Sequence, residues 1–148
     1  MNWIDQEVLD AAQEIVLPAV SRILSFEADA NATDREGLTT PLHQASGFGH
    51  VQSVVELVER EADIEAKNAL GWTALHYASS NGHLPVVNEL VERGADVDSK
   101  GNVGETPLHN ATLMGHLPVV KALLGNGADC RAANNRGVLA MGTAHLGV

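Results

Sequence analysis

The stretch "TALHYASSNGHLPVVNELVERGAD", which begins at Thr73, decides how this chain is organised. A closely similar stretch, "TPLHQASGFGHVQSVVELVEREAD", begins at Thr40, and a third, "TPLHNATLMGHLPVVKALLGNGAD", begins at Thr106. Successive copies start 33 residues apart and align without a gap. Repetition at a fixed period of this length indicates a repeat protein in which each copy is one structural unit.

Each copy predicts two helices and a loop. Threonine suits the cap of a first helix, and proline suits its first turn, where a missing N–H is no loss. The glycine of "GH" permits the left-handed backbone that ends this helix. Pro85 and Pro118 open the second helix, and Gly94 and Gly127 follow its end. The polar stretch "VDSKGNVGE" then predicts a projecting turn or short hairpin. Such a unit buries its apolar faces only by stacking on its neighbours.

The copies resemble the ankyrin-repeat family, whose units are about 33 residues long and carry the signature T-P-L-H-x-A. Thr40 to Ala45 and Thr106 to Ala111 match this signature in full, and Thr73 to Ala78 depart from it only at the proline. The resemblance implies an all-α repeat solenoid, an ankyrin-repeat stack of helix-turn-helix units with projecting β-hairpin or finger loops. It also implies a non-catalytic protein–protein interaction module.

We expect a single ankyrin-repeat domain over residues 1–148. Its units are predicted as an N-terminal capping repeat at 1–33, repeats at 34–67, 68–100 and 101–133, and a truncated C-terminal repeat at 134–148. The last unit is either a short cap or the point at which a longer protein was cut. The capping unit is offset by 34 residues from the next copy, so the first finger is expected to be distorted.

Two glutamates depart from the repeat pattern. Glu27 and Glu61 occupy the position that Gly94 and Gly127 fill in the later copies. If the backbone there is left-handed, each non-glycine residue costs on the order of 1 kcal/mol. We therefore expect the N-terminal half to be the less stable one.

Charge and cysteine content narrow the partners and the compartment. Nine Lys and Arg against nineteen Asp and Glu give a net charge of -10, which disfavours nucleic acid and anionic membranes as partners. Cys130 is the single cysteine, which excludes an internal disulfide and fits a reducing compartment. The acidic start lacks the pattern of a secretory signal, and no apolar run is long enough for a spanning helix. The sequence predicts a monomer in the cytoplasm, with the nucleus as the alternative.

Six of the seven histidines form two series, and the structural interpretation of both is preferred over a metal or catalytic site. The first series is His43, His76 and His109, and the second is His50, His83 and His116; His145 belongs to neither. Metal ligands must converge on one point, whereas equivalent residues of stacked repeats lie about a helix diameter apart. The resemblance implies that the first series bonds backbone and threonine groups and the second the adjacent loop.

No catalytic motif or cofactor site is predicted, so the chain is not expected to be an enzyme. Cys130 has no motif around it. The aspartates at 29, 63, 96 and 129 recur in register and are interpreted as loop-capping residues, and Asn31 is given a structural role by default.

The resemblance implies a partner protein bound on a concave face made by the finger loops and first helices. The candidate partner-binding residues are Arg35, Glu36, Leu38, Phe48, Leu70, Trp72, Tyr77, Asn81, Glu105, Leu113 and Met114. The apolar members are expected to face solvent, with Trp72 as the main anchor, because clustered apolar residues around a tryptophan mark interfaces. The other interpretation is that some of them cover the neighbouring finger. A second hypothesis is a regulatory or targeting segment of a larger protein, possibly an enzyme.

Overall fold

A computed structural model describes residues 30–34 and 38–141. Several sequence predictions concern residues outside this part of the chain. They are those for residues 1–29, which include Glu27 and Asp29, and those for Arg35, Glu36 and His145. The helices of the described part are α3 (Pro41–Phe48), α4 (Val51–Glu59), α5 (Ala74–Ser80), α6 (Leu84–Glu92), α7 (Pro107–Leu113) and α8 (Leu117–Gly125).

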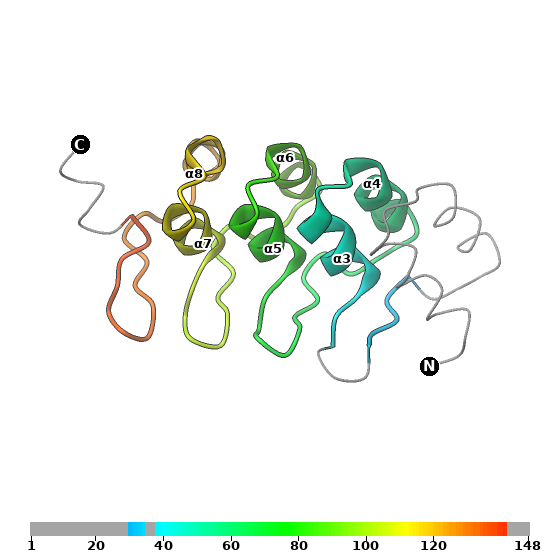
Figure 1. The fold of residues 1–148 in the computed structure, drawn as a ribbon, viewed down its shortest axis with the longest axis horizontal. Helices are drawn as coiled ribbons and strands as arrows, with labels where there is room; N and C mark the ends of the chain where they lie inside the picture. The colour runs from blue at the N-terminus through cyan, green and yellow to red at the C-terminus, as the bar shows by residue number, and fades with distance from the viewer. Residues whose placement is uncertain (1–29, 35–37, 142–148) are drawn as a thin grey trace.

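The helices form two rows. Each first helix packs on the second helix of its own unit, and like helices pack on one another, α3 on α5 on α7 and α4 on α6 on α8. Figure 1 shows this stack with the finger loops projecting from the α3–α5–α7 side. The fingers are loops in the described part, with one isolated antiparallel bridge, between Ala133 and Leu139. The all-α repeat solenoid is confirmed.

The first helices begin as the sequence predicts, with a threonine cap. Thr73 Oγ1 accepts from the backbone N–H of His76 at 3.4 Å, and His76 Nδ1 accepts from the backbone N–H of Thr73 at 3.1 Å. The same reciprocal pair opens α3 and α7. Each histidine thereby takes the place that a glutamate or glutamine holds in the usual capping box. Two otherwise unpaired backbone donors are satisfied at the start of every first helix.

Glycine ends these helices in a left-handed turn. Gly49, Gly82 and Gly115 have φ values of 78°, 74° and 75°. This conformation costs glycine little because it has no Cβ. The turn carries the chain directly into the second helix, whose first turn holds Pro85 in α6 and Pro118 in α8, as predicted.

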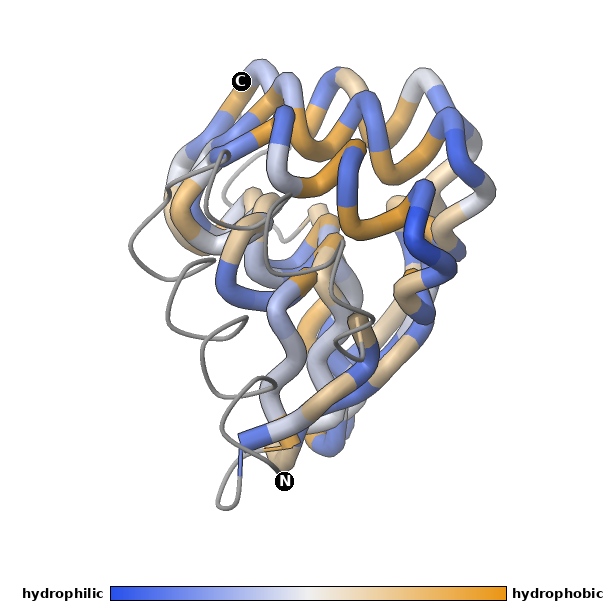
Figure 2. The backbone as a smooth tube through the Cα atoms, turned by 90° about the vertical axis from the view of Figure 1, so that its right-hand side faces the viewer, coloured by the Kyte–Doolittle hydropathy of each residue, from blue (hydrophilic) through white to orange (hydrophobic). Residues whose placement is uncertain are grey.

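The core lies between the two rows of helices. One leucine from each first helix and one valine and one leucine from each second helix are buried in register: Leu42, Leu75, Leu108, Val54, Val87, Val120, Leu57, Leu90 and Leu123. Strongly hydrophobic segments recur along the helical layer (Figure 2). Burial of these side chains between neighbours holds the stack together, since an isolated unit would leave them exposed.

Glu61 keeps the left-handed backbone that the repeat pattern requires at its position, which is the condition for the expected strain. Glu61 has a φ of 64°, and Gly94 and Gly127 at the same repeat position have φ values of 94° and 87°. In the first finger, the backbone N–H of Asp34 donates to the carbonyl of Thr39, five residues later. In the next finger, the backbone N–H of Asn68 donates to the carbonyl of Trp72, four residues later.

The first finger has a left-handed non-glycine, Leu38, two residues before its threonine cap, where the next two fingers have the left-handed glycines Gly71 and Gly104. Leu38 has a φ of 55°, and with Glu61 it is one of the two non-glycine residues of positive φ in the described part. The part of the predicted distortion that the described residues show is the longer span from Asp34 to Thr39.

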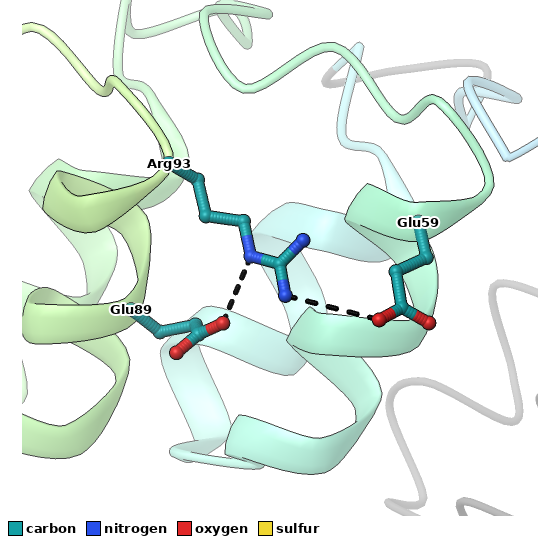
Figure 3. Close-up of polar contacts among 3 residues, drawn as sticks. All are labelled: Glu59, Glu89 and Arg93. Atoms are coloured by element: carbon teal, nitrogen blue, oxygen red, sulfur yellow. Dashed lines mark hydrogen bonds and ion pairs between the residues drawn. The ribbon is translucent and has the colours of Figure 1, made fainter.

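Arg93 makes one ion pair within its own unit and one with the second helix of the preceding unit, on the outside of the stack. Arg93 Nε lies 2.9 Å from Glu89 Oε1 within its own unit, and its Nη2 lies 3.9 Å from Glu59 Oε1 of α4 (Figure 3). Exposed pairs of this kind contribute about 1 kcal/mol or less. The interlocked apolar row, rather than these charges, therefore dominates the cohesion of neighbouring units. Within the described residues, every helix is too short or too polar to cross a membrane.

Candidate functional site

Two grooves lie between the finger loops and the first helices. The larger, called the C-terminal groove, has a volume of about 760 Å³ and is lined by Leu70, Trp72, Asn102, Val103, Glu105, His109, Asn110, Thr112, Leu113, Asn134, Arg136, Val138, Leu139 and Ala140. The smaller, called the N-terminal groove, has a volume of about 240 Å³ and is lined by Thr39, His43, Gln44, Gly47, Phe48, Tyr77 and Asn81. The C-terminal groove is large enough for a small ligand or several side chains of a partner.

The predicted binding residues are divided between these grooves. Those on the C-terminal groove are Leu70, Trp72, Glu105 and Leu113. Those on the N-terminal groove are Phe48, Tyr77 and Asn81. Leu38 and Met114 are exposed but line neither groove. Arg35 and Glu36 lie outside the described residues.

Trp72 is not the solvent-facing side chain that the sequence predicted. It is half-buried, and its indole Nε1 donates to Glu105 Oε1 at 2.8 Å. Its ring lies nearly parallel to that of His76, with centroids 5.9 Å apart, and meets the ring of Tyr77 edge-on at 5.2 Å. The indole lies in this position because three neighbours hold it. Trp72 therefore supports the wall of the groove, and its N–H is already used within the protein.

Glu105, another predicted binding residue, is buried, with 8% of its surface accessible. Its position in the repeat corresponds to Trp72 in the previous finger and Val138 in the next. Gly101 stands where those fingers have an asparagine, and a Cβ there would overlap Glu105 Oε1. The carboxylate thus fills space that only glycine leaves open. Its other oxygen, Oε2, is buried without a hydrogen-bond partner.

The polar residues of the N-terminal groove are partly framework as well. Asn68 Nδ2 donates to the Tyr77 hydroxyl at 2.6 Å, and Asn81 Nδ2 donates to the carbonyl of Gly47 at 2.9 Å. Burial raises the pKa of Tyr77, and the Asn68 bond opposes that shift. Both side chains therefore bind within the protein, and Phe48 is the exposed member of the predicted set here.

The first histidine series has the structural role that the resemblance implied. His43 Nε2 donates to the carbonyl of Trp72 at 2.8 Å, and His76 Nε2 donates to the carbonyl of Glu105 at 3.0 Å. His109 makes the same bond to the next finger. In this tautomer Nδ1 is the acceptor for the threonine N–H, as the bonding pattern assigns it. Burial lowers the pKa of both His43 and His76.

The second series was expected to bond the adjacent loop, but two of its members, His83 and His116, instead bond the last turn of the first helix in the preceding unit. His83 Nε2 donates to the carbonyl of Gly47, and His116 Nε2 donates to the carbonyl of Ser80, each at 3.0 Å. Their rings lie against Gly49 and Gly82, where a Cβ would stand 2.5 Å from Nδ1. Among the described residues, no group of three or more His, Cys, Asp or Glu side chains could hold a metal ion.

The recurring aspartates cap loops, as predicted. Asp63, Asp96 and Asp129 each accept the backbone N–H of the residue two positions later at 2.9 Å. Asn31 accepts from the backbone N–H of Asp63 and donates to the carbonyl of Glu61, which confirms its structural role.

Sequence reasoning missed several residues of the C-terminal groove. Val138 and Leu139 are 50% and 40% exposed on it, and Asn110 lies at its floor with 6% of its surface accessible. The repeat register could have found them, because Val138 corresponds to Trp72 and Asn110 to Tyr77. The finger at 128–140 spans the predicted boundary between the repeat at 101–133 and the truncated repeat at 134–148, and the sequence predicts no binding residue on it.

The fold and its grooves define a class of protein, the repeat solenoids, in which identical frameworks present a variable concave face. A family model described as ankyrin repeats (3 copies) matches residues 9–101, and a second, ankyrin repeats (many copies), matches residues 80–124. The first match covers more than half of the chain, and the chain belongs to the ankyrin-repeat family. Ankyrin repeats are generally protein–protein interaction modules and are typically non-catalytic. No curated protein matches the sequence.

Proposed function

We propose that this chain is a non-catalytic interaction module that binds a protein partner on its concave surface, with the C-terminal groove as the main contact. The observation that carries the proposal is the apolar wall of this groove. Leu113 is 83% exposed, and Leu70 is 54% exposed on the opposing finger. Both line the same depression. Exposed apolar side chains around a concave site favour association, because a partner removes them from water.

The anchor is assigned to these leucines rather than to Trp72. Replacing Trp72 by alanine would remove the only hydrogen bond that the Glu105 carboxylate makes with the described residues, as well as the contacts with His76 and Tyr77. The variant would therefore change the groove and the stack together. A substitution at Leu113 changes the exposed wall and leaves these contacts in place.

The experiment compares Leu113→Asp with a matched apolar control on the outer row. Leu124 is 36% exposed on α8, outside the groove. Wild type, Leu113→Asp and Leu124→Asp are used to capture partners from native cell extract, after each is shown to fold by circular dichroism. We expect Leu113→Asp to lose a partner that wild type and Leu124→Asp retain. Equal capture by all three would contradict the concave site.

We further propose that the protein works in a reducing compartment, the cytoplasm or the nucleus. The support is that its only cysteine, Cys130, is exposed and is unpaired. Fluorescence microscopy of the tagged chain in its native cell would test this, and accumulation in a secretory compartment would contradict it.

A further inference from the structure

We propose that the C-terminal groove takes a segment of the partner in which a lysine or arginine lies beside an apolar residue. The cation would bind Glu105, and the apolar side chain would pack on Leu113, Val138 and Leu139. This inference rests on the proposed function and names the chemistry of the partner. It is carried by one carboxylate oxygen and one amide nitrogen that the protein buries in the groove and leaves without partners.

The first observation is the unequal use of the Glu105 carboxylate. Oε1 accepts from Trp72 Nε1 at 2.8 Å, whereas Oε2 is buried and has no donor among the residues that the structure describes. A buried carboxylate oxygen without a donor is costly, because it has lost water and gained nothing in return. A donor supplied by the partner would recover this loss, so the oxygen favours an occupied groove.

The carboxylate cannot easily turn away from the groove. It lies against Gly101, where the space of a missing Cβ accommodates Oε1, and the indole of Trp72 holds the same oxygen. The backbone N–H of Gly101 also donates to the carbonyl of Glu105 at 2.8 Å. Oε2 is thus held in place before any partner arrives, which reduces the entropy lost on binding.

The second observation is Asn110, whose Nδ2 is buried without an acceptor on the same groove. It is not a general feature of the framework, because Tyr77 at the same repeat position has its hydroxyl bonded to Asn68. An amide N–H calls for an acceptor, and the backbone carbonyl of an extended partner segment is one. Glu105 and Asn110 together favour a peptide that brings a donor and an acceptor to the floor of the groove.

A third unpaired group on the groove, Thr112 Oγ1, has a different explanation. Ser46 and Ser79, at the same repeat position in the preceding first helices, also have buried hydroxyls without a partner. The feature therefore recurs with the framework and does not indicate a ligand. The unpaired atoms of Glu105 and Asn110 do not recur, and they belong to this groove alone among the described first helices and fingers.

A cation fits Glu105 better than a neutral donor does. Hydrogen bonds between a cation and a carboxylate are shorter and about twice as strong as neutral ones. The chain's net charge of -10 would also attract a basic segment over long range. The groove has one cation of its own, Arg136, but this side chain is exposed. Solvent screens an exposed charge more than a buried one. The negative charge of Glu105 therefore outweighs the positive charge of Arg136 at the floor of the groove.

The test begins with a phage-displayed library of random seven-residue peptides selected on the full chain. We expect the selected peptides to combine a lysine or arginine with a neighbouring apolar residue. Their affinities are measured by fluorescence anisotropy on wild type, Glu105→Gln and Leu113→Asp. Glutamine keeps an oxygen for the Trp72 N–H but replaces the charge, so we expect a loss of about tenfold or more.

A matched peptide isolates the charge without changing the protein. The basic residue is replaced by norleucine, which keeps an aliphatic stem and no cation. We expect this peptide to lose about tenfold on wild type and little on Glu105→Gln, since the two changes remove the same interaction. The wild-type arm needs no variant to fold, so it tests the requirement for a cation even if Glu105→Gln is unstable.

The outcomes separate this inference from the proposed function. If Leu113→Asp abolishes peptide binding while Glu105→Gln and norleucine leave it unchanged, the concave site stands and the inference fails. Selected peptides without an enriched cation would overturn it in the same way. If neither Leu113→Asp nor Glu105→Gln alters binding of any selected peptide, both proposals fail.

Discussion

Replacing Glu61 by glycine should stabilise the protein. Glu61 holds a φ of 64°, and a left-handed conformation costs an L-residue about 1–2 kcal/mol. Glycine avoids this cost, but it increases the conformational entropy of the unfolded chain. This effect lowers the gain in stability by about 0.4–1 kcal/mol. The net gain in the free energy of unfolding should be roughly 0.5–1 kcal/mol. The exposed side chain makes no ion pair among the described residues, and the bond from Asn31 uses the Glu61 carbonyl, which glycine keeps.

The reverse change one unit later is the matched control. Gly94 occupies the same repeat position with a φ of 94°, and a Cβ added there meets no atom within 4 Å. Gly94→Ala therefore introduces backbone strain without a steric clash. We expect it to lower the free energy of unfolding by about 1 kcal/mol.

Thermal and urea unfolding followed by circular dichroism measures both changes. For a chain of this length, 1 kcal/mol corresponds to a shift in Tm of about 2–4 °C. Stacked repeats need not unfold in one step, so the steepness of each transition is compared as well as its midpoint. Glu61→Gly should raise the midpoint and Gly94→Ala should lower it. An unchanged or lowered midpoint for Glu61→Gly would refute the strain argument.

Two further perturbations have defined outcomes. Because burial lowers the folded-state pKa of His43 and His76 below the ordinary 6.5, the unfolded chain takes up protons first. Stability should therefore fall as the pH drops below about 6.5, by at most about 1.4 kcal/mol per pH unit for each histidine, and His76→Gln should reduce this slope in urea titrations. Gly82 and Gly115 have nearly equal φ, but only Gly82 lies against a ring, that of His116. Gly82→Ala should thus lower Tm more than Gly115→Ala, and equal losses would contradict the steric argument.

The framework was predictable because its signals are local or repeat at a fixed interval. Each threonine cap and its histidine lie three residues apart, and each left-handed glycine follows its own helix. The strain at Glu61 was also visible, because Gly94 and Gly127 mark what that position requires. Comparison of three copies therefore predicts backbone conformation as well as helix boundaries.

The groove was less predictable because its contacts cross from one unit to the next. Trp72 was expected to face solvent, and nothing near it in sequence reveals that Glu105, 33 residues later, accepts its indole N–H. That pair in turn requires glycine at position 101, where the two neighbouring fingers have an asparagine. Trp72, Glu105 and Gly101 each differ from the residues at the same repeat position in the other copies. The other copies therefore give no guide to how these three side chains pack.

The histidine bonds explain how a uniform stack can present a varied face. His43, His76 and His109 all donate to backbone carbonyls of the next finger, at positions where the side chains are those of Trp72, Glu105 and Val138. The carbonyl is available whichever residue stands there, so the framework places no demand on that side chain.

Side chains that differ from finger to finger on the concave face therefore stand on backbone that the histidine bonds hold in place. An aromatic ring, a carboxylate and an aliphatic group occupy one repeat position while the stacking bond to it stays the same. Rigid placement lowers the entropy lost on binding, and free choice of side chain sets which partner fits. The Trp72–Glu105 bond adds a constraint of its own, since a change at either residue leaves the other without its partner. Specificity in the C-terminal groove should consequently depend on pairs of adjacent fingers rather than on single positions.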